Sequence, residues 1–556
     1  MAEKLIVNVV TAIITRNQSR AAVNILVLIG GVLVQTKFKK FSKTLLPAML
    51  VAGLVAGCGN GGNNKAAPEA SAGANAGTTA AADPVEITWG IHLQAPGVVE
   101  NSQVQKWLEE KFNVKIKPVK VTDASIASGE VPDIFMLGDP ANVTAYQNQG
   151  VLMSLDQNML KEKMPEYYAD IEKNNALFQT VTIDDKLWAI PMFIDLKPYD
   201  LAMLWRKDWL DKVGITKAPE TLDEFEKAIY AFAQKDPDGN GQKDTYGLTG
   251  TATSTWSSGF YSIFGAFGVE PTMWHEKNGE IMNGSVMPET KEALAKLRQW
   301  FADGVIDPEF ITDTQDSYRK KLYNNRIGVI EEQIAKGALP DAATVTEMKS
   351  LNPNAELVFA KNPKGPGGDG SWDWGVKSNF IVISNKVKDQ PEKLNKLFEI
   401  LRAESTDEET INMTSLGVKG THWDFTESGA TSGATQFKAG FEKAEERDQA
   451  GIRLFSLGNI TTQAYREKYS NPALNEAIKT YSSAPRQTDA LLFSALPSDG
   501  KYKNDLTSLM QKYFAQIISG EIPLEDFDKF VAEWKSRGGD ELTKEANEMY
   551  QAQFKK

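Results

Sequence analysis

The sequence predicts an α/β protein with more than one lobe and a helical C-terminal tail. The folded part opens with short strands that alternate with amphipathic helices, which predicts a mainly parallel sheet covered by helices. About 470 residues follow a low-complexity linker, which is too long for one hydrophobic core and predicts two large lobes. From Phe437 onward the pattern is mostly helical, with little strand signal.

The elements follow from the spacing of apolar residues. Residues 85–91 and 114–119 alternate as strands, residues 100–112 form an amphipathic helix, and residues 131–136 form a short buried strand. Thr221, followed three residues later by Glu224, forms the capping box of a helix. Later elements are three helices, at 221–235, 290–302 and 391–403, and a buried strand at 380–383.

The only cysteine, Cys58, ends a segment typical of an export signal. Lysines between positions 37 and 43 precede the apolar run 45–55, and a Gly/Asn-rich stretch follows at 59–64. A cysteine at this position resembles the lipobox of bacterial lipoproteins, in which the thiol is lipidated and becomes the first residue of the mature chain. The alternative is a free buried cysteine that happens to follow small residues.

We therefore interpret residues 1–57 as a leader and residues 58–84 as the lipidated cysteine with a flexible linker. As a coil the linker spans roughly 25–30 Å. Two apolar runs, 5–14 and 21–34, precede the signal and are shorter than the roughly 18–20 residues of a membrane-spanning helix. They form a membrane hairpin or, as we favour, lie before a translation start near Val34.

The charge of the chain argues against nucleic acid as a partner. The formal net charge is −12, and the leader holds seven Lys/Arg and one Glu, so the chain without its leader is near −18. Such a charge opposes binding to phosphate backbones. With a single cysteine the chain has no internal disulfide.

Six segments occur in an order that resembles a known family. They are ASGEVPDIF, GVLMSLD, KLWAIP, LWRKDWLDKVGI, TLDEFEKAIYAFAQKDPDGNGQKDTYGLTG and KLYNNRIGVI. Over residues 85–425 the chain resembles the family 1 extracellular solute-binding proteins of carbohydrate ABC importers. Within that family it is similar to lipoprotein receptors related to the alginate- and pectin-oligosaccharide-binding proteins.

This resemblance implies a two-lobe, type II periplasmic-binding-protein-like clamshell with ligand in the cleft. It implies crossings between lobes near 191–204 and 374–383. Lobe 1 is then 85–196 plus 377–425, and lobe 2 is 197–376 plus 426–556. It also implies a monomer that is not an enzyme, lipid-anchored on the outer face of the cytoplasmic membrane in a Gram-positive-type envelope. Such a receptor closes around an oligosaccharide and delivers it to permease subunits.

An aspartate-rich loop predicts a structural calcium site. Side-chain oxygens stand at positions 1, 3, 5 and 9, a glycine stands at position 6, and the position-7 carbonyl adds a ligand. Position 12 is Gly247 instead of the glutamate of an EF-hand, so water, the Thr245 hydroxyl or a distant group completes the site. The alternative is an Asx turn that satisfies its own backbone. The predicted ligands are Asp236, Asp238, Asn240, Gln242 and Asp244.

Aromatic residues at the expected cleft loops are candidates for stacking on sugar rings. The candidate ligand-binding residues are Trp205, Arg206, Trp256, Trp372, Trp374, His422 and Trp423. The alternative for each tryptophan is packing in the core or hinge, which we expect for Trp209, Trp300 and Trp534. Arg206 would bind a uronate carboxylate in a bidentate manner or, alternatively, form a salt bridge with Asp208 or another acidic residue of the lobe.

Two other functions remain open at this point. A secreted lipoprotein polysaccharide lyase or glycoside hydrolase would need catalytic groups in the cleft, such as paired carboxylates, which the sequence leaves open. A sensory or adhesive lipoprotein would need no permease.

The glycine-rich stretch 365–370 is interpreted as a surface loop, because no helix follows it. The three histidines have no metal-ligand spacing.

Overall fold

The computed structural model describes residues 24–29, 32–37, 83–174, 176–183, 185–193, 199–252, 259–373, 377–426, 435–457, 460–482 and 487–555. The chain divides into two units, residues 1–80 and 81–556. The first unit contains an antiparallel hairpin of β1 (Asn24–Ile29) and β2 (Val32–Lys37). Residues 35–37, expected in the basic start of the signal, thus lie in β2. Cys58 and the linker up to residue 82 lie outside the described residues.

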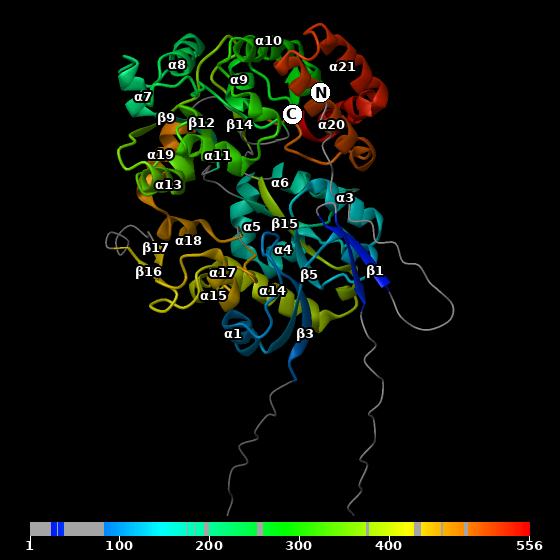
Figure 1. Ribbon diagram of the computed structural model, residues 1–556. Helices are drawn as coiled ribbons and strands as arrows, with labels where there is room; N and C mark the ends of the chain where they lie inside the picture. The colour runs from blue at the N-terminus through cyan, green and yellow to red at the C-terminus, as the bar shows by residue number, and fades with distance from the viewer. Residues whose placement is uncertain are drawn as a thin grey trace, which may run out of the picture. The chain divides into compact units, whose positions relative to one another are not determined.

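The first lobe of the second unit is built on a five-stranded sheet with the order β4-β3-β5-β15-β8 (Figure 1). As predicted, β3 pairs in parallel with β4 and β5, whereas β15 runs antiparallel to β5 and β8. Residues of these strands and of the surrounding helices form one hydrophobic core. The strands are β3 (Val85–Gly90), β4 (Val114–Val119), β5 (Ile134–Leu137), β8 (Ile190–Phe193) and β15 (Lys377–Ile383).

Asp133, within the segment ASGEVPDIF, has a structural role in this sheet. It is 1% exposed, and its carboxylate accepts hydrogen bonds from the backbone N and Oγ1 of Thr88 at 2.7 and 2.9 Å. Lys386 and Lys393 lie 3.2 and 3.3 Å from the same carboxylate. A buried carboxylate is tolerated when it is paired in this way, so Asp133 ties β5 to β3.

The remaining elements of the first lobe are mostly short helices. They are α1 (Gln103–Phe112), α2 (Asp123–Ala127), α3 (Pro140–Asn148), α4 (Gln157–Lys163), α5 (Pro165–Ile171), η1 (Glu172–Asn174), α6 (Ala176–Gln179), β6 (Thr182–Ile183), β7 (Lys186–Leu187), η4 (Asn385–Val387), α14 (Pro391–Thr406), α15 (Glu408–Ser415), β16 (Trp423–Phe425), β17 (Thr435–Phe437), α17 (Ala444–Ala450) and α18 (Gln463–Lys468).

The second lobe centres on a three-stranded antiparallel sheet, β12-β9-β13, with β9 (Leu201–Arg206) in the middle. Helix α8 (Leu222–Gln234) begins with the predicted capping box, because the Thr221 side chain accepts from the Glu224 backbone N and Glu224 accepts in return. Its buried face places Phe225 and Phe232 edge-on against Trp205. Trp209 and Trp300 are fully buried in the same core, as expected.

The other elements of the second lobe include the C-terminal helices. They are α7 (Lys207–Lys212), α9 (Tyr261–Ala266), β10 (Trp274–Lys277), β11 (Glu280–Asn283), η2 (Gly284–Val286), α10 (Pro288–Ala302), η3 (Pro308–Ile311), α11 (Gln315–Tyr323), β12 (Val329–Gln333), α12 (Ile334–Gly337), α13 (Ala343–Leu351), β13 (Leu357–Ala360), β14 (Trp372–Asp373), α19 (Pro472–Tyr481), β18 (Gln487–Thr488), α20 (Asp499–Ser519), α21 (Asp526–Trp534), η5 (Lys535–Gly539), α22 (Asp540–Met549) and η6 (Tyr550–Phe554).

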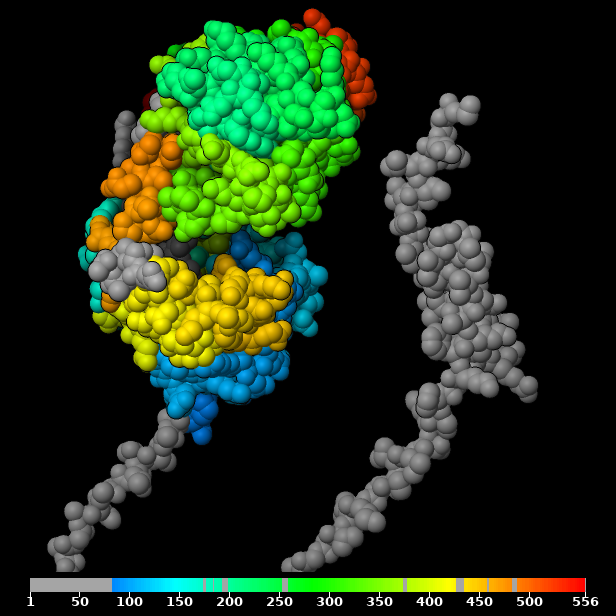
Figure 2. Space-filling view, turned by 60° about the vertical axis from the view of Figure 1, so that its left-hand side comes forward, coloured from blue at the N-terminus to red at the C-terminus, as the bar shows by residue number. Residues whose placement is uncertain are grey.

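The C-terminal tail is shared between the lobes, which differs from the expected boundary at residue 425. The first core includes Ile452, Leu454, Leu457, Ile460 and Phe455, which lies edge-on to Trp89 with 6.2 Å between ring centroids. The tail changes lobe between α18 and α19, because Ile478 packs in a cluster with Leu204. Figure 2 shows a furrow on one face between the green second-lobe residues and the yellow and blue first-lobe residues. No described helix has the length and apolarity needed to span a bilayer.

Candidate functional site

A cavity of about 340 Å³ is lined by residues of both lobes. The first lobe contributes residues 138–140, the turn that leads from the C-terminal end of β5 into α3. The second lobe contributes Pro271, Thr272, Trp274, Trp372 of β14 and part of α20. Helix α20 contacts α3 of the first lobe (Figure 1). Ligands of open α/β sheets bind at such C-terminal strand ends, so this cavity is the candidate binding site.

Trp372, which the sequence predicts as a ligand contact, lines the cavity. Its indole Nε1 donates a hydrogen bond to Thr272 Oγ1 at 3.2 Å. The ring lies 5.4 Å from the Phe493 ring, and Trp274 lies on the same wall. Trp372 is 5% exposed, whereas Trp274 and Phe493 are half-buried. The three rings together give the wall aromatic carbon surface, which suits the apolar face of a sugar ring.

Charged groups from both lobes meet in the cavity. Asp139 caps α3, because its Oδ1 accepts from the Ala141 backbone N at 2.9 Å, and its Oδ2 lies 3.9 Å from Lys503 Nζ. Lys503 of α20 also lies 4.0 Å from Asp499 Oδ2. Burial raises the pKa of Asp499, although Lys503 opposes this shift.

Asp489 holds the second-lobe side of the cavity in place. Its carboxylate is 2% exposed and accepts backbone hydrogen bonds from Trp274, Leu491 and Phe493 at 2.7, 2.9 and 3.0 Å. Burial raises its pKa, and these hydrogen bonds oppose the shift. Asp489 and Lys503 were not predicted from the sequence, because the helical tail offers no local signal for a cleft. The dipeptide Thr488-Asp489 just before a turn is the one weak signal.

Trp205 and Arg206 lie in the second-lobe interior instead of the cavity wall. Trp205 is 0% exposed and Arg206 is 4% exposed. The guanidinium donates to Asp208 from Nε and Nη2 at 2.9 and 2.7 Å and to Asn325 Oδ1 from Nη1 at 2.6 Å. It also stacks on Trp209 at 4.7 Å. The alternative pairing with Asp208 is therefore the one that the structure contains, because β9 is the central strand and has no free face.

His422 and Trp423 are buried in the first lobe and are also absent from the cavity wall. The Trp423 indole donates to the Gly417 carbonyl at 2.9 Å, and His422 Nδ1 accepts from the Val418 backbone N at 2.7 Å. Burial lowers the pKa of His422. Their polar atoms thus close the turn before β16. Trp256 and Trp374 lie outside the described residues.

The aspartate loop follows α8 and brings its side-chain oxygens together. Asn240 Nδ2 donates to Asp238 Oδ2 at 2.8 Å and to Asp244 Oδ1 at 3.1 Å. Asp236 accepts from the backbone N of Gly239, Asn240 and Gly241. The hydrogen bond that Asp236 shares with Asp238 lowers the pKa of Asp236, while burial and that bond raise the pKa of Asp238. Two carboxylates that shift each other's pKa in this way lie close together and fit a site for a cation.

The geometry explains why position 12 of this loop is glycine. A Cβ on Gly247 would lie 2.2 Å from the Ile229 carbonyl oxygen in α8, so a glutamate has no room there. The Thr245 hydroxyl donates to the Phe232 carbonyl at 2.9 Å and therefore holds the end of α8. Gln242 is placed by its backbone N, which donates to Asn240 Oδ1 at 2.7 Å. No described group of three or more His, Cys, Asp or Glu is already arranged around a metal position.

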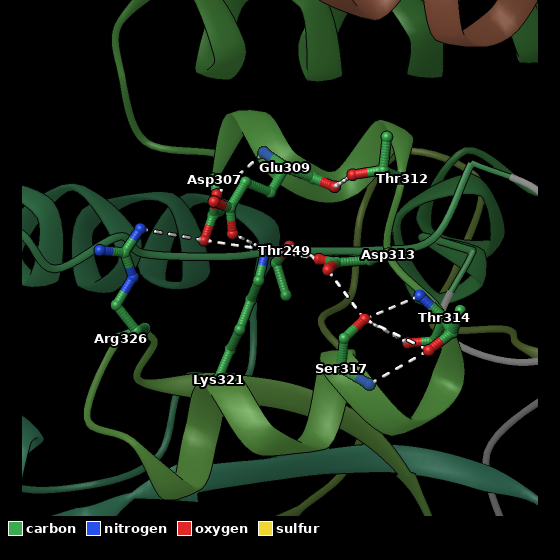
Figure 3. Close-up of polar contacts among 9 residues, drawn as sticks. All are labelled: Thr249, Asp307, Glu309, Thr312, Asp313, Thr314, Ser317, Lys321 and Arg326. Atoms are coloured by element: carbon green, nitrogen blue, oxygen red, sulfur yellow. Dashed lines mark hydrogen bonds and ion pairs between the residues drawn. The ribbon is translucent and has the colours of Figure 1, made fainter. Parts of the chain in front are cut away.

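A buried ion cluster fixes the segment that follows the aspartate loop (Figure 3). Lys321 Nζ of α11 lies 3.1 Å from Asp307 Oδ2 and 2.5 Å from Asp313 Oδ2. Burial alone lowers the pKa of Lys321, but these carboxylates outweigh burial and raise it. The Asp307 backbone N donates to the Leu248 carbonyl at 2.9 Å, and Thr249 Oγ1 donates to Asp313 at 3.4 Å. The cluster thus joins the loop exit to η3 and α11.

Comparison with known proteins assigns the family. Residues 98–402 match the model of the bacterial extracellular solute-binding protein family, which is more than half of the 556-residue chain. The chain belongs to this family. A solute-binding protein is a receptor and not a lyase or hydrolase, so the enzymatic alternative is set aside. The predicted resemblance and the two-lobe α/β fold are confirmed.

Three relatives from two bacteria match this solute-binding protein, two of them over most of its length and the third over a smaller part. Lipoprotein LipO of Bacillus subtilis is 24% identical over 82% of this chain and 89% of LipO. The polygalacturonan/rhamnogalacturonan-binding protein YtcQ of the same organism is 24% identical over 84% of this chain and 91% of YtcQ. FusA, a fructooligosaccharide ABC transporter substrate-binding protein of Streptococcus pneumoniae, is 25% identical over 37% of this chain and 40% of FusA.

Solved structures share the fold. The alginate-binding protein AlgQ2, solved without calcium ion, has a TM-score of 0.64 and 17% identity, and the match covers 85% of this chain and 99% of AlgQ2. An EF-hand mutant of FusA in complex with fructo-nystose has a TM-score of 0.61 and 17% identity, and the match covers 84% of this chain and 99% of FusA. At this identity the likeness concerns the fold.

Proposed function

We propose that this solute-binding protein is a membrane-tethered extracellular receptor that binds an oligosaccharide between its lobes and delivers it to an ABC permease. The cavity with its aromatic wall, lined by both lobes, carries the proposal. The names of YtcQ and FusA, which state saccharide ligands, support it. A ligand that contacts both lobes stabilises the closed arrangement, and the permease would recognise that arrangement.

A thermal-shift screen of the purified protein against oligosaccharides, followed by titration calorimetry, tests this function. We expect at least one oligosaccharide to raise the melting temperature without being cleaved. Trp372 is the proposed stacking residue, and Trp256 and Trp374, which lie outside the described residues, are proposed as further contacts. Cleavage of the ligand, or no shift with any oligosaccharide, would contradict the proposal.

We also propose that Cys58 carries the lipid anchor and that the receptor faces the cell exterior as a monomer. The export-signal pattern around Cys58 and the lipoprotein relative LipO support this. Labelling cells with an alkyne fatty acid should mark the wild type and leave Cys58→Ser unlabelled and released from membranes. Equal labelling of both proteins would contradict the anchor. Gel filtration of the released protein should give a monomer.

We propose that the aspartate loop binds Ca²⁺ through Asp236, Asp238, Asn240, the Gln242 carbonyl and Asp244. The facing carboxylates of Asp236 and Asp238 support a cation here, as does the existence of an EF-hand in FusA. Bound Ca²⁺ would neutralise these carboxylates and fix the exit of α8. Calcium titration after chelation should raise the melting temperature, and an unchanged melting temperature would contradict the site.

A further inference from the structure

The charge of the cavity lining is negative. Among the described lining residues, three carboxylates face one ammonium group: Asp139, Asp489 and Asp499 against Lys503. Asp139 belongs to the first lobe and the other three belong to the second lobe, so the imbalance is present on both sides. An anionic ligand that enters this cavity meets more repulsion than attraction.

Lys503, the one cation of the described lining, already lies between two carboxylates. Its Nζ is 3.9 Å from Asp139 Oδ2 and 4.0 Å from Asp499 Oδ2. Both distances are longer than a hydrogen bond, so Lys503 is attracted to the two carboxylates by charge alone. The attraction to Asp139 of the first lobe and to Asp499 of the second lobe is similar in strength. A uronate carboxylate that approaches Lys503 would have to share it with both aspartates.

The arginine that would suit a uronate does not reach the cavity. Arg206 is 4% exposed, and its guanidinium is bonded to Asp208 and Asn325. Freeing it would leave the Asp208 carboxylate without its bidentate partner, which is costly for a largely buried pair. The bidentate recognition expected from the sequence is therefore not offered by Arg206.

The same lining suits hydroxyl groups. A carboxylate accepts a strong, charge-assisted hydrogen bond from a hydroxyl. Asp139 presents its Oδ2 near Lys503, whereas the Asp499 Oδ2 near Lys503 also accepts a hydrogen bond from the Leu496 backbone N at 3.0 Å. Asn283, Ser285 and Asn504 add neutral groups that donate and accept. A uronate carboxylate only accepts hydrogen bonds, so it cannot use the aspartate oxygens.

We therefore propose that the ligand is an electrically neutral oligosaccharide, and that Asp139 with Asp499 excludes uronate-containing sugars. This inference rests on the proposed function of the same cavity. One like charge at about 6 Å disfavours an anion by roughly tenfold in affinity at intermediate screening. We expect neutral oligosaccharides to bind about ten- to a hundredfold more tightly than uronates of equal length.

Titration calorimetry on the full purified protein tests the inference. The probes are xylo-, manno- and fructo-oligosaccharides of three to five units, with oligogalacturonates and alginate oligomers of the same lengths. Binding of a neutral sugar with a margin of about tenfold or more over every uronate would support the inference. Equal or tighter binding of a uronate would overturn it while leaving the proposed function intact. If no sugar binds, the proposed function fails and the inference fails with it.

An uncharged variant separates the effect of the Asp139 charge on ligand choice from the role of Asp139 as a helix cap. Asp139→Asn keeps the helix cap, because asparagine caps helices as well as aspartate does, but removes one negative charge from the cavity. We expect it to narrow the preference for neutral sugars by about three- to tenfold. Asp156→Asn is the matched control, since Asp156 caps α4 by the same Oδ1 contact at 2.8 Å and lies outside the cavity lining. An unchanged preference in Asp139→Asn would overturn the role assigned to Asp139.

Discussion

The Lys321 ammonium lies 3.1 Å from Asp307 Oδ2, and the Asp307 side chain is 0% exposed. The Asp307 backbone N also donates to the Leu248 carbonyl, which joins the pair to the segment that follows the aspartate loop. A lysine this buried remains charged because Asp313 shares it at 2.5 Å. The pair thus couples the integrity of the second lobe to the loop that precedes the candidate ligand contacts.

Replacing Lys321 should therefore destabilise the second lobe strongly. Lys321→Met leaves Asp307 and Asp313 buried without their cation, which costs about 3–5 kcal/mol of unfolding free energy. Urea unfolding followed by tryptophan fluorescence measures the loss. Lys479→Met is the control, because Lys479 and Glu476 form a pair with 71% exposure on each side, worth about 1 kcal/mol at most. Similar losses in the two variants would contradict the prediction.

Gly247→Ala tests why the aspartate loop departs from an EF-hand. The added Cβ would lie 2.2 Å from the Ile229 carbonyl oxygen, so α8 or the loop must shift, at a cost of about 1–3 kcal/mol. Thermal unfolding measures this cost. Gly500→Ala in α20 is the control, because nothing lies within 4 Å of its Cβ position and alanine is the better helix former. A Gly247→Ala variant as stable as wild type would mean that the close approach is wrong.

The calcium proposal predicts a difference between two residues of one loop. Asp236→Ala should abolish the rise in melting temperature on adding Ca²⁺, which we expect to be on the order of 2–8 °C in the wild type. Lys243→Ala should keep that rise, because Lys243 stands at position 8 and supplies no side-chain oxygen. Differential scanning fluorimetry with and without chelator makes the comparison. Retention of the full rise in Asp236→Ala would contradict the assigned ligand.

Glu404 should make the stability of the protein depend on pH. Burial raises its pKa from about 4.5 to about 8, against hydrogen bonds from Thr414 and Leu457. Because the folded-state pKa is raised, its protonated form stabilises the fold fully below pH 4.5. That stability falls by at most about 1.4 kcal/mol per pH unit up to pH 8.

Glu404→Gln should flatten this part of the stability profile between pH 5 and pH 8. Chemical unfolding at four pH values in this range measures the slope for each protein. Glu399→Gln on the same helix is the control, because Glu399 is 50% exposed and its substitution should leave the slope unchanged. Parallel profiles for wild type and Glu404→Gln would contradict the prediction.

Trp372→Ala should weaken ligand binding by the folded variant. Loss of the stacking face should reduce affinity by about 10- to 30-fold, which corresponds to about 1.4–2 kcal/mol. Calorimetric titration with the best ligand of the screen measures the change. Trp107→Ala on α1 is the control, because this half-buried tryptophan packs on the first-lobe core away from the cavity lining. Equal affinities in the two variants would contradict the role of Trp372.

Local pattern predicted the elements well where the signal is local. The sequence predicted the capping box of Thr221 and Glu224 and the parallel pairing of β3 with β4 and β5, because caps and strand periodicity depend on neighbours in sequence. The position at which the tail passes from one lobe to the other could not be predicted from the sequence. An amphipathic helix must bury one face, but its sequence does not say against which core. The packing of tail residues such as Phe437, Ile452 and Phe455 on the first-lobe core was therefore not predicted.

The residues of the candidate site also divide into those with a local sequence signal and those without one. Trp372 was found because an aromatic pair after a Gly/Pro loop is a local signal, whereas Asp139, Asp489 and Lys503 come from three segments that meet only in the fold. Arg206 is the opposite case. Trp205-Arg206 was a candidate ligand contact from local pattern, but it lies on the central strand β9, and the packing around that strand buries it.

By itself the sequence determined the family, the order of strands and helices, the tether pattern at Cys58 and the oxygen spacing of the aspartate loop. Each of these depends on residues close together in the chain. Only the tertiary structure decided that Arg206 is committed to Asp208, that Gly247 leaves no room for a glutamate, and that the cavity is lined by an excess of carboxylates. Charge balance and close packing arise between segments far apart in sequence, and folding alone brings those segments together.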